Sequence, residues 1–288
     1  MSRIAYVNGR YLPHAEASVH IEDRGYQFAD GVYEVIAVQG GEFVDEELHL
    51  ARLGRSLAEL RIAAPMSQRA LALVLHEVIR RNRVRDGIVY LQATRGVAPR
   101  DHPFPADIRT TLVVTARRAR AANPKMLSEG ASVITIPDIR WARCDIKSIA
   151  LLPNVLGKQQ AREAGAYEAW QVDSAGTVTE GTSTNAWIIT DAGELVTRQA
   201  SSAILNGCTR LALLDIARRI GLTFVERPFS VAEAKAAREA FLTSTTSLVL
   251  PIVRIDGTAI GDGRPGPLVL KLRALYAAHG DEQAALVA

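Results

Sequence analysis

Alternating and helically spaced apolar residues divide the first half of the chain into strands and helices. The segment IAYVNGRYL predicts a hairpin with a tight turn at Asn8-Gly9, and residues 32–38, rich in Val, Ile and Tyr, predict a strand. Four leucines at helical spacing predict a helix over 46–61, and Ser67 is a suitable N-cap for a second helix. Further strands are expected at 88–93 and 111–115.

The second half mixes strands and helices without a strict βαβ order. The stretch 118–124 lacks apolar periodicity, so we place a boundary there, between an N-terminal domain over 1–120 and a C-terminal domain over 125–288. Strands are expected at 131–136, 168–172 and 186–190, and helices at 153–164, 209–220, 230–239 and 266–278. This mixture favours a two-domain α+β enzyme over a Rossmann protein.

Composition narrows the class of protein. The 288 residues are 48% hydrophobic and 23% charged, which allows a sizeable core and excludes composition-driven disorder. The 34 basic and 31 acidic residues give a net charge of only +3, too small an excess to indicate nucleic acid or membrane as a partner. No signal-type apolar region is evident, and Cys144 and Cys208 are far apart, so we expect a cytoplasmic protein with no disulfide framework.

Three sequence patterns that resemble known binding motifs are better explained without a binding function. GDGRPG at 261–266 matches a dinucleotide-binding fingerprint but leaves no room for a second strand, so it is interpreted as a surface turn. RRNRVR at 80–85 is better explained as a solvated helix end than as a phosphate patch. The six histidines show no ligand spacing, so no metal is expected.

Lysine is scarce, since only five of the 34 basic residues are lysines. An amine that forms a Schiff base must be desolvated enough to be nucleophilic near neutral pH. Lys147 precedes the apolar run IALL, whereas Lys158, Lys235 and Lys271 have polar neighbours in helical stretches. The residues alone leave open whether Lys147 is a functional amine or a lysine at a strand end.

Six blocks stand out along almost the whole length of the chain. They are EDRGYQFADGVYEV (22–35), TRGVAPRDHPFP (94–105), DIRWARCDIKSIALL (138–152), TVTEGTSTNAW (177–187), ILNGCTR (204–210) and LTSTTS (242–247). In this order and at this spacing, the blocks resemble those of the D-amino-acid aminotransferases, fold-type IV enzymes that depend on pyridoxal 5'-phosphate. The resemblance implies two domains, the second barrel-like, and an active site at the domain and subunit interface.

The resemblance implies the two central catalytic groups. Lys147 would form the Schiff base with the cofactor and then shuttle the α-proton, as an amine displaced from the cofactor can do. Glu180 would face the pyridine nitrogen and keep it protonated, so that the ring accepts electrons. Without the family match, Glu180 is better interpreted as an exposed turn residue.

The resemblance also implies the contacts to the cofactor phosphate. They are Arg52, Cys208, Thr209 and Thr245, with Cys208 contributing only its backbone amide. Cys208 and Thr209 begin a predicted helix, whose free N–H groups and dipole favour an anion. Structural alternatives are a surface cation for Arg52 and a small buried residue for Cys208.

Tyr33, Arg100 and His102 match the family's binding set for the substrate α-carboxylate, here called the carboxylate trap. Arg100 can meet a carboxylate with two parallel hydrogen bonds, and the other two can each add a donor. In family members this Arg/His loop reaches the neighbouring subunit, so the resemblance implies a homodimer. Outside the family, Arg-Asp-His in a loop is more often a solvated turn.

The leading hypothesis is transamination between a D-amino acid, typically D-alanine, and a 2-oxo acid such as 2-oxoglutarate or pyruvate. Rivals of the same fold are a branched-chain L-amino-acid aminotransferase, an R-selective amine transaminase and an aminodeoxychorismate lyase, and the Arg/His pair with Tyr33 favours the D-amino-acid branch. A basic nucleic-acid-binding protein and a relative without catalysis belong to other classes. The intact pair Lys147 and Glu180 argues against the latter.

Overall fold

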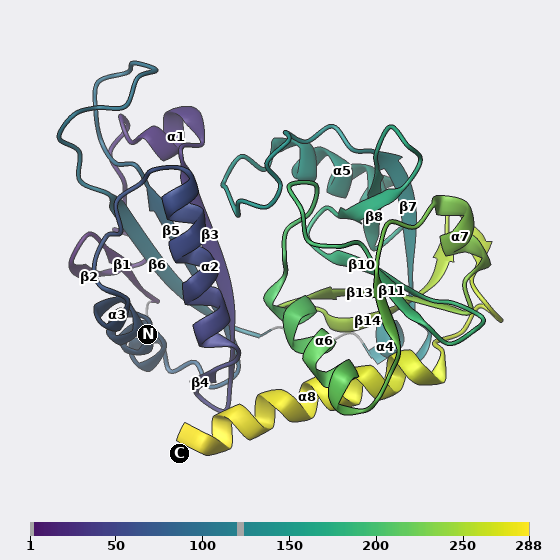
Figure 1. Cartoon of the computed structure of the whole chain (residues 1–288). Coiled ribbons are helices and arrows are strands. Elements are labelled where there is room, and N and C mark those ends of the chain that lie inside the picture. Colours follow the sequence, from purple (N-terminus) through teal and green to yellow (C-terminus); the bar gives the residue numbers. More distant parts are fainter. Residues whose placement is uncertain (1–2, 120–123, 288) are drawn as a thin grey trace. The chain divides into compact units, whose positions relative to one another are not determined.

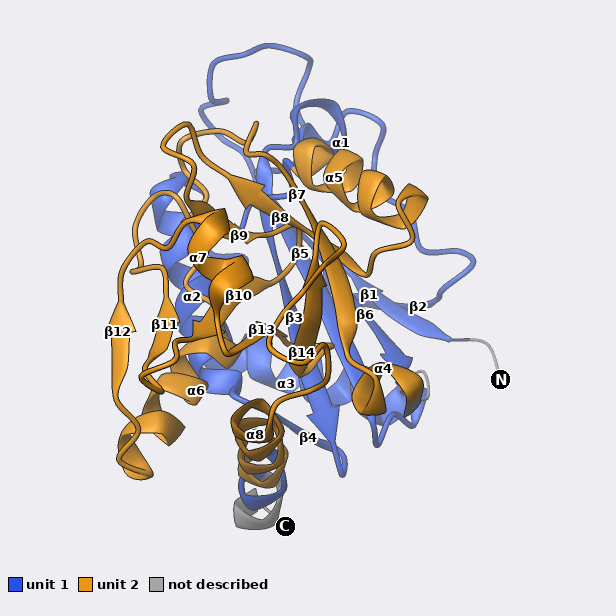
Figure 2. Cartoon of the chain, turned by 90° about the vertical axis from the view of Figure 1, so that its right-hand side faces the viewer, with its two compact units in different colours: residues 1–120, 146–150, 280–288 blue, residues 121–145, 151–279 orange. Residues whose placement is uncertain are grey.

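The computed structural model describes residues 3–119 and 124–287, which fall into two compact units. Unit 1 comprises residues 1–120, 146–150 and 280–288, and unit 2 comprises residues 121–145 and 151–279 (Figure 2). Part of the expected boundary, 120–123, lies outside the described residues. The segment 146–150, which contains Lys147, belongs to unit 1. Each unit combines a sheet with helices, so the expected α+β class is confirmed.

Unit 1 contains a sheet in which every neighbouring pair of described strands is antiparallel, in the order β2-β1-β6-β5-β3-β4. Asn8 and Gly9 have φ angles of 46° and 91°, as the tight turn between β1 and β2 requires, which confirms the predicted hairpin. The strands are β1 (Ile4–Val7), β2 (Arg10–Pro13), β3 (Gly31–Gln39), β4 (Glu42–Phe43), β5 (Gly87–Thr94) and β6 (Thr111–Arg118).

Two long helices, α2 (Glu46–Glu59) and α3 (Gln68–Asn82), bury their apolar stripes in one core with alternate residues of β3, β5 and β6. Figure 1 shows α2 running along β3. The α3 N-cap is Ser67, whose hydroxyl accepts from the nitrogen of Ala70 at 3.3 Å, as expected. A short helix, α1 (Arg24–Phe28), precedes β3 and was not predicted.

Unit 2 contains a larger mixed sheet, ordered β12-β11-β10-β13-β14-β7-β8-β9 in its described part, with β15 paired to β14. The pairs β11–β12, β14–β7 and β7–β8 are parallel. The strands are β7 (Ala131–Pro137), β8 (Glu168–Val172), β9 (Val178–Gly181), β10 (Asn185–Ile189), β11 (Leu195–Thr197), β12 (Phe224–Glu226), β13 (Glu239–Ser244), β14 (Leu248–Ile255) and β15 (Thr258–Ala259).

The remaining helices are α4 (Pro124–Ser128), α5 (Leu152–Glu163), α6 (Cys208–Arg219), α7 (Val231–Ala236) and α8 (Pro267–Val287). Both faces of this sheet are covered, because successive residues of β10 enter different cores. Trp187 and Ile189 pack with apolar residues of α6 and α8, whereas Ala186 and Ile188 pack in a core that includes Ala234 of α7. Strands buried on both faces lack the polar alternation of a half-exposed strand.

One predicted helix, over 230–239, is wrong in its last three residues. Ser230 caps α7 as expected, but the helix ends at Ala236, and Ala237 is extended with φ −66° and ψ 150°. Glu239 then begins β13, and its carboxylate accepts from the nitrogens of Leu268 and Val269 at the start of α8. Among the described residues, no helix combines the length and apolar character needed to cross a bilayer.

Candidate functional site

The segment 146–150 lies along the edge of β3 in unit 1. Hydrogen bonds hold the backbone of Lys147, within this segment, at two points. The nitrogen of Tyr33 donates to the carbonyl oxygen of Lys147 at 3.0 Å, and Val32 and Ser148 form an antiparallel bridge. The nitrogen of Lys147 donates to the hydroxyl of Ser56 on α2 at 3.3 Å. A strand and a helix therefore fix the point from which the lysine side chain extends.

The amine of Lys147 lies over an aromatic ring. Its Nζ atom is 4.2 Å from the ring centroid of Tyr33, and the side chain is half-buried. Within the described residues this Nζ makes no hydrogen bond and no ion pair. The ring stabilises the ammonium only modestly compared with a carboxylate, so the amine is not locked in an ion pair. The structure thus brings together two of the expected site residues, Lys147 and Tyr33.

Arg52 lies in a buried cluster with Glu34 and His49. Its Nε and Nη2 atoms donate to the two carboxylate oxygens of Glu34, both at 2.7 Å, and His49 Nδ1 lies 2.7 Å from Glu34 Oε2. Burial alone would raise the pKa of Glu34, but the charge and hydrogen bonds of Arg52, with His49, hold it at about 2. Burial lowers the pKa of His49, so the ring is neutral at pH 7. Arg52 is therefore a buried cation rather than the surface cation of the structural alternative.

This cluster predicts that the protein loses stability in acid in two stages. The unfolded chain protonates His49 near its ordinary pKa of 6.5 and Glu34 near 4.5, whereas the folded chain resists both. The contribution of His49 is therefore lost as the pH falls below 6.5, and that of Glu34 as it falls from 4.5 to about 2. Urea unfolding across this pH range should show the free energy of unfolding falling in both intervals.

Glu34→Gln tests the same cluster at neutral pH. It removes the carboxylate that accepts two hydrogen bonds from the buried guanidinium of Arg52, and should lower the free energy of unfolding by about 3–5 kcal/mol. Glu77→Gln is the matched control, since Glu77 pairs with Arg80 and Arg81 on the exposed side of α3 and should matter far less. Equal losses in the free energy of unfolding would show that the buried cluster stabilises the protein no more than the exposed ion pairs of Glu77 do.

Glu180 lies on β9 in unit 2, buried and surrounded by donors rather than exposed in a turn. It accepts from Nη1 of Arg140, from Nδ2 of Asn185 at 3.0 Å and from the nitrogen of Leu205 at 3.1 Å. Arg140 is itself fixed by two hydrogen bonds to Asp138, at 2.7 and 2.9 Å. The arginine places a positive charge beside the Glu180 carboxylate, and the nitrogen of Leu205 adds a backbone donor.

Cys208 and Thr209 begin α6, and both are buried. The N-cap is Gly207, and among the described residues no side-chain cap hydrogen bond is made at this helix start. A side chain at Gly207 would collide with Asn185, whose Oδ1 would lie 2.3 Å from an added Cβ. The hydroxyl of Thr209 lies 3.4 Å from that of Tyr276. A helix start of this kind, with a buried hydroxyl beside it, is suited to an anion.

Thr245 lies in the turn between β13 and β14. The turn is closed by a hydrogen bond from the nitrogen of Ser247 to the hydroxyl of Ser244, at 3.1 Å. Thr245 is half-buried, and within the part of the chain that the structure describes its hydroxyl has no hydrogen-bond partner. The hydroxyl is therefore available to a ligand.

Arg100 and His102 share one platform in unit 1, the ring of Phe28 on α1. The guanidinium carbon of Arg100 is 4.5 Å from the ring centroid, and the ring of His102 is 5.6 Å away. Tyr33 instead contacts Tyr90, at 5.8 Å between centroids. Among the described residues no hydrogen bond, ion pair or ring contact joins Tyr33 to Arg100 or His102. The structure brings together two members of the carboxylate trap and not the third.

Several side chains around these sites were not anticipated from the sequence. The sequence did contain a signal for Glu34. It occupies an inward position in the alternation of β3, and a charge buried there needs a partner. Arg140 and Asn185 lie within the family blocks, but nothing in the sequence indicates that they contact Glu180. Arg140 is forty residues from Glu180 along the chain, and Asn185 is five residues from it.

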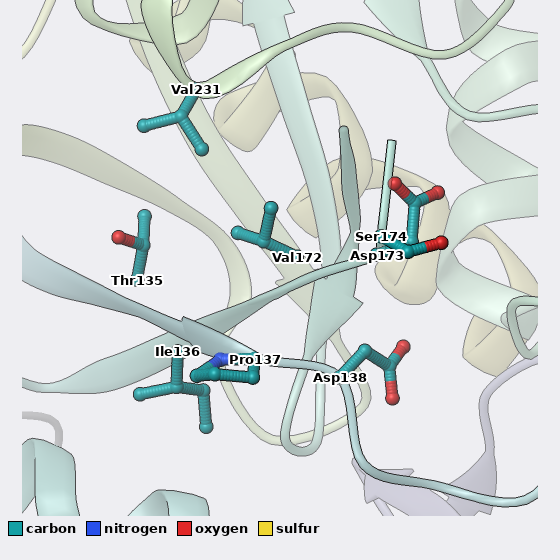
Figure 3. Close-up of a pocket in the computed structure, with 8 residues that line it drawn as sticks. All are labelled: Thr135, Ile136, Pro137, Asp138, Val172, Asp173, Ser174 and Val231. Atoms are coloured by element: carbon teal, nitrogen blue, oxygen red, sulfur yellow. The ribbon is translucent and has the colours of Figure 1, made fainter. Parts of the chain in front are cut away.

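Unit 2 also has a pocket that none of the predicted site residues lines (Figure 3). Its two carboxylates already have partners: Asp138 accepts from Arg140, and Asp173 accepts from Arg198 at 2.8 Å. The remaining lining side chains are Thr135, Ile136, Pro137, Val172, Ser174 and Val231. We assign it no part in the site.

Residues 31–255 match the family model described as amino-transferase class IV. The chain belongs to this family, whose members use pyridoxal 5'-phosphate.

Curated relatives are similar over nearly the whole chain. The D-alanine aminotransferase of Bacillus licheniformis is 45% identical over 262 residues, 91% of this chain and 91% of that protein. The D-alanine aminotransferase of Listeria innocua is 41% identical over 272 residues, 94% of this chain and 93% of that protein. The family resemblance seen in the sequence is confirmed.

Solved structures share the fold. The branched-chain aminotransferase of the archaeon Thermoproteus uzoniensis with norvaline has a TM-score of 0.87 at 25% identity, covering 96% of this chain and 94% of that chain. The PLP form of the Thermobaculum terrenum branched-chain amino acid aminotransferase has a TM-score of 0.84 at 26% identity, covering 96% of this chain and 93% of that chain.

Residues of each unit have the chemistry that this cofactor uses. Its phosphate is an anion, and among the described residues α6 begins without a side-chain cap, next to the buried hydroxyl of Thr209. The half-buried hydroxyl of Thr245 has no partner in the described residues. The aldehyde of the cofactor can react with a primary amine, and within the described residues the amine of Lys147 makes no ion pair. A carboxylate would stabilise its protonated ring nitrogen, and the Glu180 carboxylate is buried beside Arg140.

Proposed function

We propose that this enzyme transfers an amino group between a D-amino acid of the D-alanine type and a 2-oxo acid, with Lys147 as the catalytic residue. The observation that carries the proposal is the placement of Lys147, whose backbone is fixed by β3 and α2 and whose amine lies over Tyr33. Similarity at 45% identity to a D-alanine aminotransferase supports the choice of substrate.

Pyridoxal 5'-phosphate, when bound, supplies an electron sink for the negative charge that develops at the amino-acid Cα. The amine of Lys147 would hold the cofactor and would move the proton at the substrate Cα. The carboxylate of Glu180 would stabilise a proton on the ring nitrogen, and Arg140 with the nitrogen of Leu205 fixes the direction of this carboxylate. Arg52, Thr209 and Thr245, with the amide of Cys208, would bind the phosphate. The proposal assigns the reactive amine to a residue of unit 1 and the ring-nitrogen contact to a residue of unit 2.

The carboxylate trap supplies the preference for amino acids. Arg100 and His102 both lie on Phe28, and within the described residues neither makes an ion pair. Arg100 can therefore give two parallel hydrogen bonds to the α-carboxylate, with His102 and the Tyr33 hydroxyl adding donors. A carboxylate fixed on one side of Cα decides which hand of amino acid presents its α-proton to Lys147.

A branched-chain L-amino-acid aminotransferase is the second candidate, favoured by the fold match to the Thermoproteus uzoniensis enzyme at a TM-score of 0.87. Absorbance spectra of the holoenzyme separate the two. D-alanine should shift the cofactor band, whereas L-alanine and L-leucine should not. A shift with L-leucine alone would establish the second candidate and refute the first.

The proposal includes a homodimer in the cytoplasm, where both cysteines would stay reduced. Apolar side chains that a second copy could bury are exposed on α5, namely Leu152, Val155 and Leu156. In unit 1, Ile21 and Tyr26 are 76% and 77% exposed. Light scattering should give twice the 31.2 kDa mass of the chain.

Glu180→Gln should slow catalysis without unfolding the protein. A neutral amide cannot hold the ring nitrogen protonated, and the loss of a charge-assisted hydrogen bond should lower kcat by about ten- to a hundredfold. Arg140 keeps Asp138 as its counter-charge, so the buried arginine is not orphaned. Glu163→Gln, at an exposed position on α5, is the matched control. An unchanged kcat across the pH range would remove Glu180 from this role.

A further inference from the structure

The loop that carries the trap, residues 95–110 and here called the trap loop, is tied to α1 through Arg24. Nη1 of Arg24 donates to the carbonyl oxygen of Asp101 at 2.6 Å, and Nη2 donates to that of His102 at 3.2 Å. The side chain of Arg24 is 4% exposed, so these bonds are shielded from water. Because the two carbonyls belong to His102 and to the residue that follows Arg100, Arg24 fixes the backbone from which both trap side chains extend.

Asp30 fixes Arg24 in turn. Its Oδ2 atom accepts from Nε of Arg24 at 2.8 Å, and its carboxylate also accepts from Nε and Nη2 of Arg95, at 2.7 and 2.9 Å. Burial alone would raise the pKa of Asp30, but hydrogen bonds from Arg95 and Arg24 lower it, so the carboxylate is charged. Arg95 lies at the start of the trap loop and stacks on Phe104 within it, at 3.6 Å from the ring centroid.

The ring of Phe28 completes the arrangement. Arg24 lies 4.9 Å from its centroid, and the trap residues Arg100 and His102 lie at 4.5 and 5.6 Å. An arginine that stacks on a ring keeps its in-plane N–H donors available for a planar anion. The block 22–35 therefore contributes more than Tyr33: it also supplies Arg24, Phe28 and Asp30.

We propose that Arg24 is the positioning residue of the carboxylate trap, holding the trap loop in the substrate-binding conformation before substrate arrives. The inference rests on the proposed function, because it assigns Arg100 and His102 to a carboxylate. A loop already ordered loses little conformational entropy on binding, so the benefit appears as substrate affinity. Arg24 touches neither substrate nor cofactor in this role and acts through the backbone at 101 and 102.

Arg24→Met tests this role on the holoenzyme. Asp30 keeps Arg95 as a partner, so no buried charge is orphaned. The KM values for D-alanine and for the 2-oxo acid should rise by about tenfold or more, with kcat within about threefold. Hydrogen exchange of the amides at 97–105 should become faster. Arg24→Lys keeps the charge but cannot span both carbonyls, and should give the same changes to a smaller degree. Arg69→Met, at an exposed position on α3, is the matched control and should change neither measurement.

A double-mutant cycle separates positioning from general stability. In an Arg100→Ala/His102→Ala background Arg24 has no trap side chains to position, so Arg24→Met should raise KM by less than about twofold. An equal rise in both backgrounds, or unchanged exchange in the trap loop, would overturn the proposal. If the wild-type enzyme does not act on D-alanine at all, the proposed function fails, while faster exchange in Arg24→Met would still support Arg24 as the anchor of this loop.

Discussion

Lys147→Ala is expected to abolish transamination while the protein stays folded. The bonds that hold this segment come from the Lys147 backbone, to Tyr33 and to Ser56, and alanine keeps them. The side chain makes only the ring contact to Tyr33 among the described residues, so its removal costs little stability. Because both proposed roles of Lys147, as covalent anchor and as the base at Cα, would be lost, turnover should fall by about a thousandfold or more.

The measurement combines steady-state rates with reductive trapping. Borohydride followed by mass spectrometry should attach the cofactor to a peptide containing Lys147 in the wild type and to no peptide in the variant. Lys271→Ala, at an exposed position on α8, is the matched control and should be trapped and active as the wild type is. Wild-type turnover in Lys147→Ala, or trapping at another lysine, would show that the amine has been assigned to the wrong residue.

Arg100→Ala is expected to lower activity with amino acids far more than activity with simple amines. Losing two charge-assisted hydrogen bonds should lower kcat/KM for D-alanine and for the 2-oxo acid by about a hundredfold or more. A primary amine without a carboxylate should be affected far less, since it never used the guanidinium. The cofactor band should be unchanged, because Lys147 is intact. An equal loss with amines and amino acids would refute a carboxylate role for Arg100.

Mixed dimers test whether the trap serves the neighbouring subunit. Lys147→Ala and Arg100→Ala should each have little or no activity with D-alanine alone, but a dimer of one chain of each would combine one intact lysine with one intact trap loop. Random assortment makes half the dimers mixed, with one good site in two, so up to about a quarter of wild-type activity should return. If subunits demonstrably exchange and no activity returns, both residues serve the same chain.

Local patterns in the sequence were enough to determine many of the elements. The leucine spacing predicted α2, Ser67 predicted the start of α3, and Asn8-Gly9 predicted the hairpin, because caps, turns and apolar stripes act over a few neighbouring residues. The six family blocks determined the class of enzyme and pointed to Lys147 and Glu180. The short strands β11 and β12 were missed, because three residues in a mixed sheet are too few to show a periodicity of their own.

Only the tertiary structure decided where these residues find their partners. Lys147 lies in the second half of the chain, yet its segment joins the edge of β3 in unit 1. The nitrogen of Tyr33 on β3 donates there to the carbonyl oxygen of Lys147, a residue that belongs to none of the strands of the sheet. Arg52 and Glu34 pair across 18 residues, and Arg140 and Glu180 across 40. A buried charge must find a counter-charge, but which one it finds depends on the packing of α2 on β3 and of the 138–145 segment beside β9, and no local pattern records that packing.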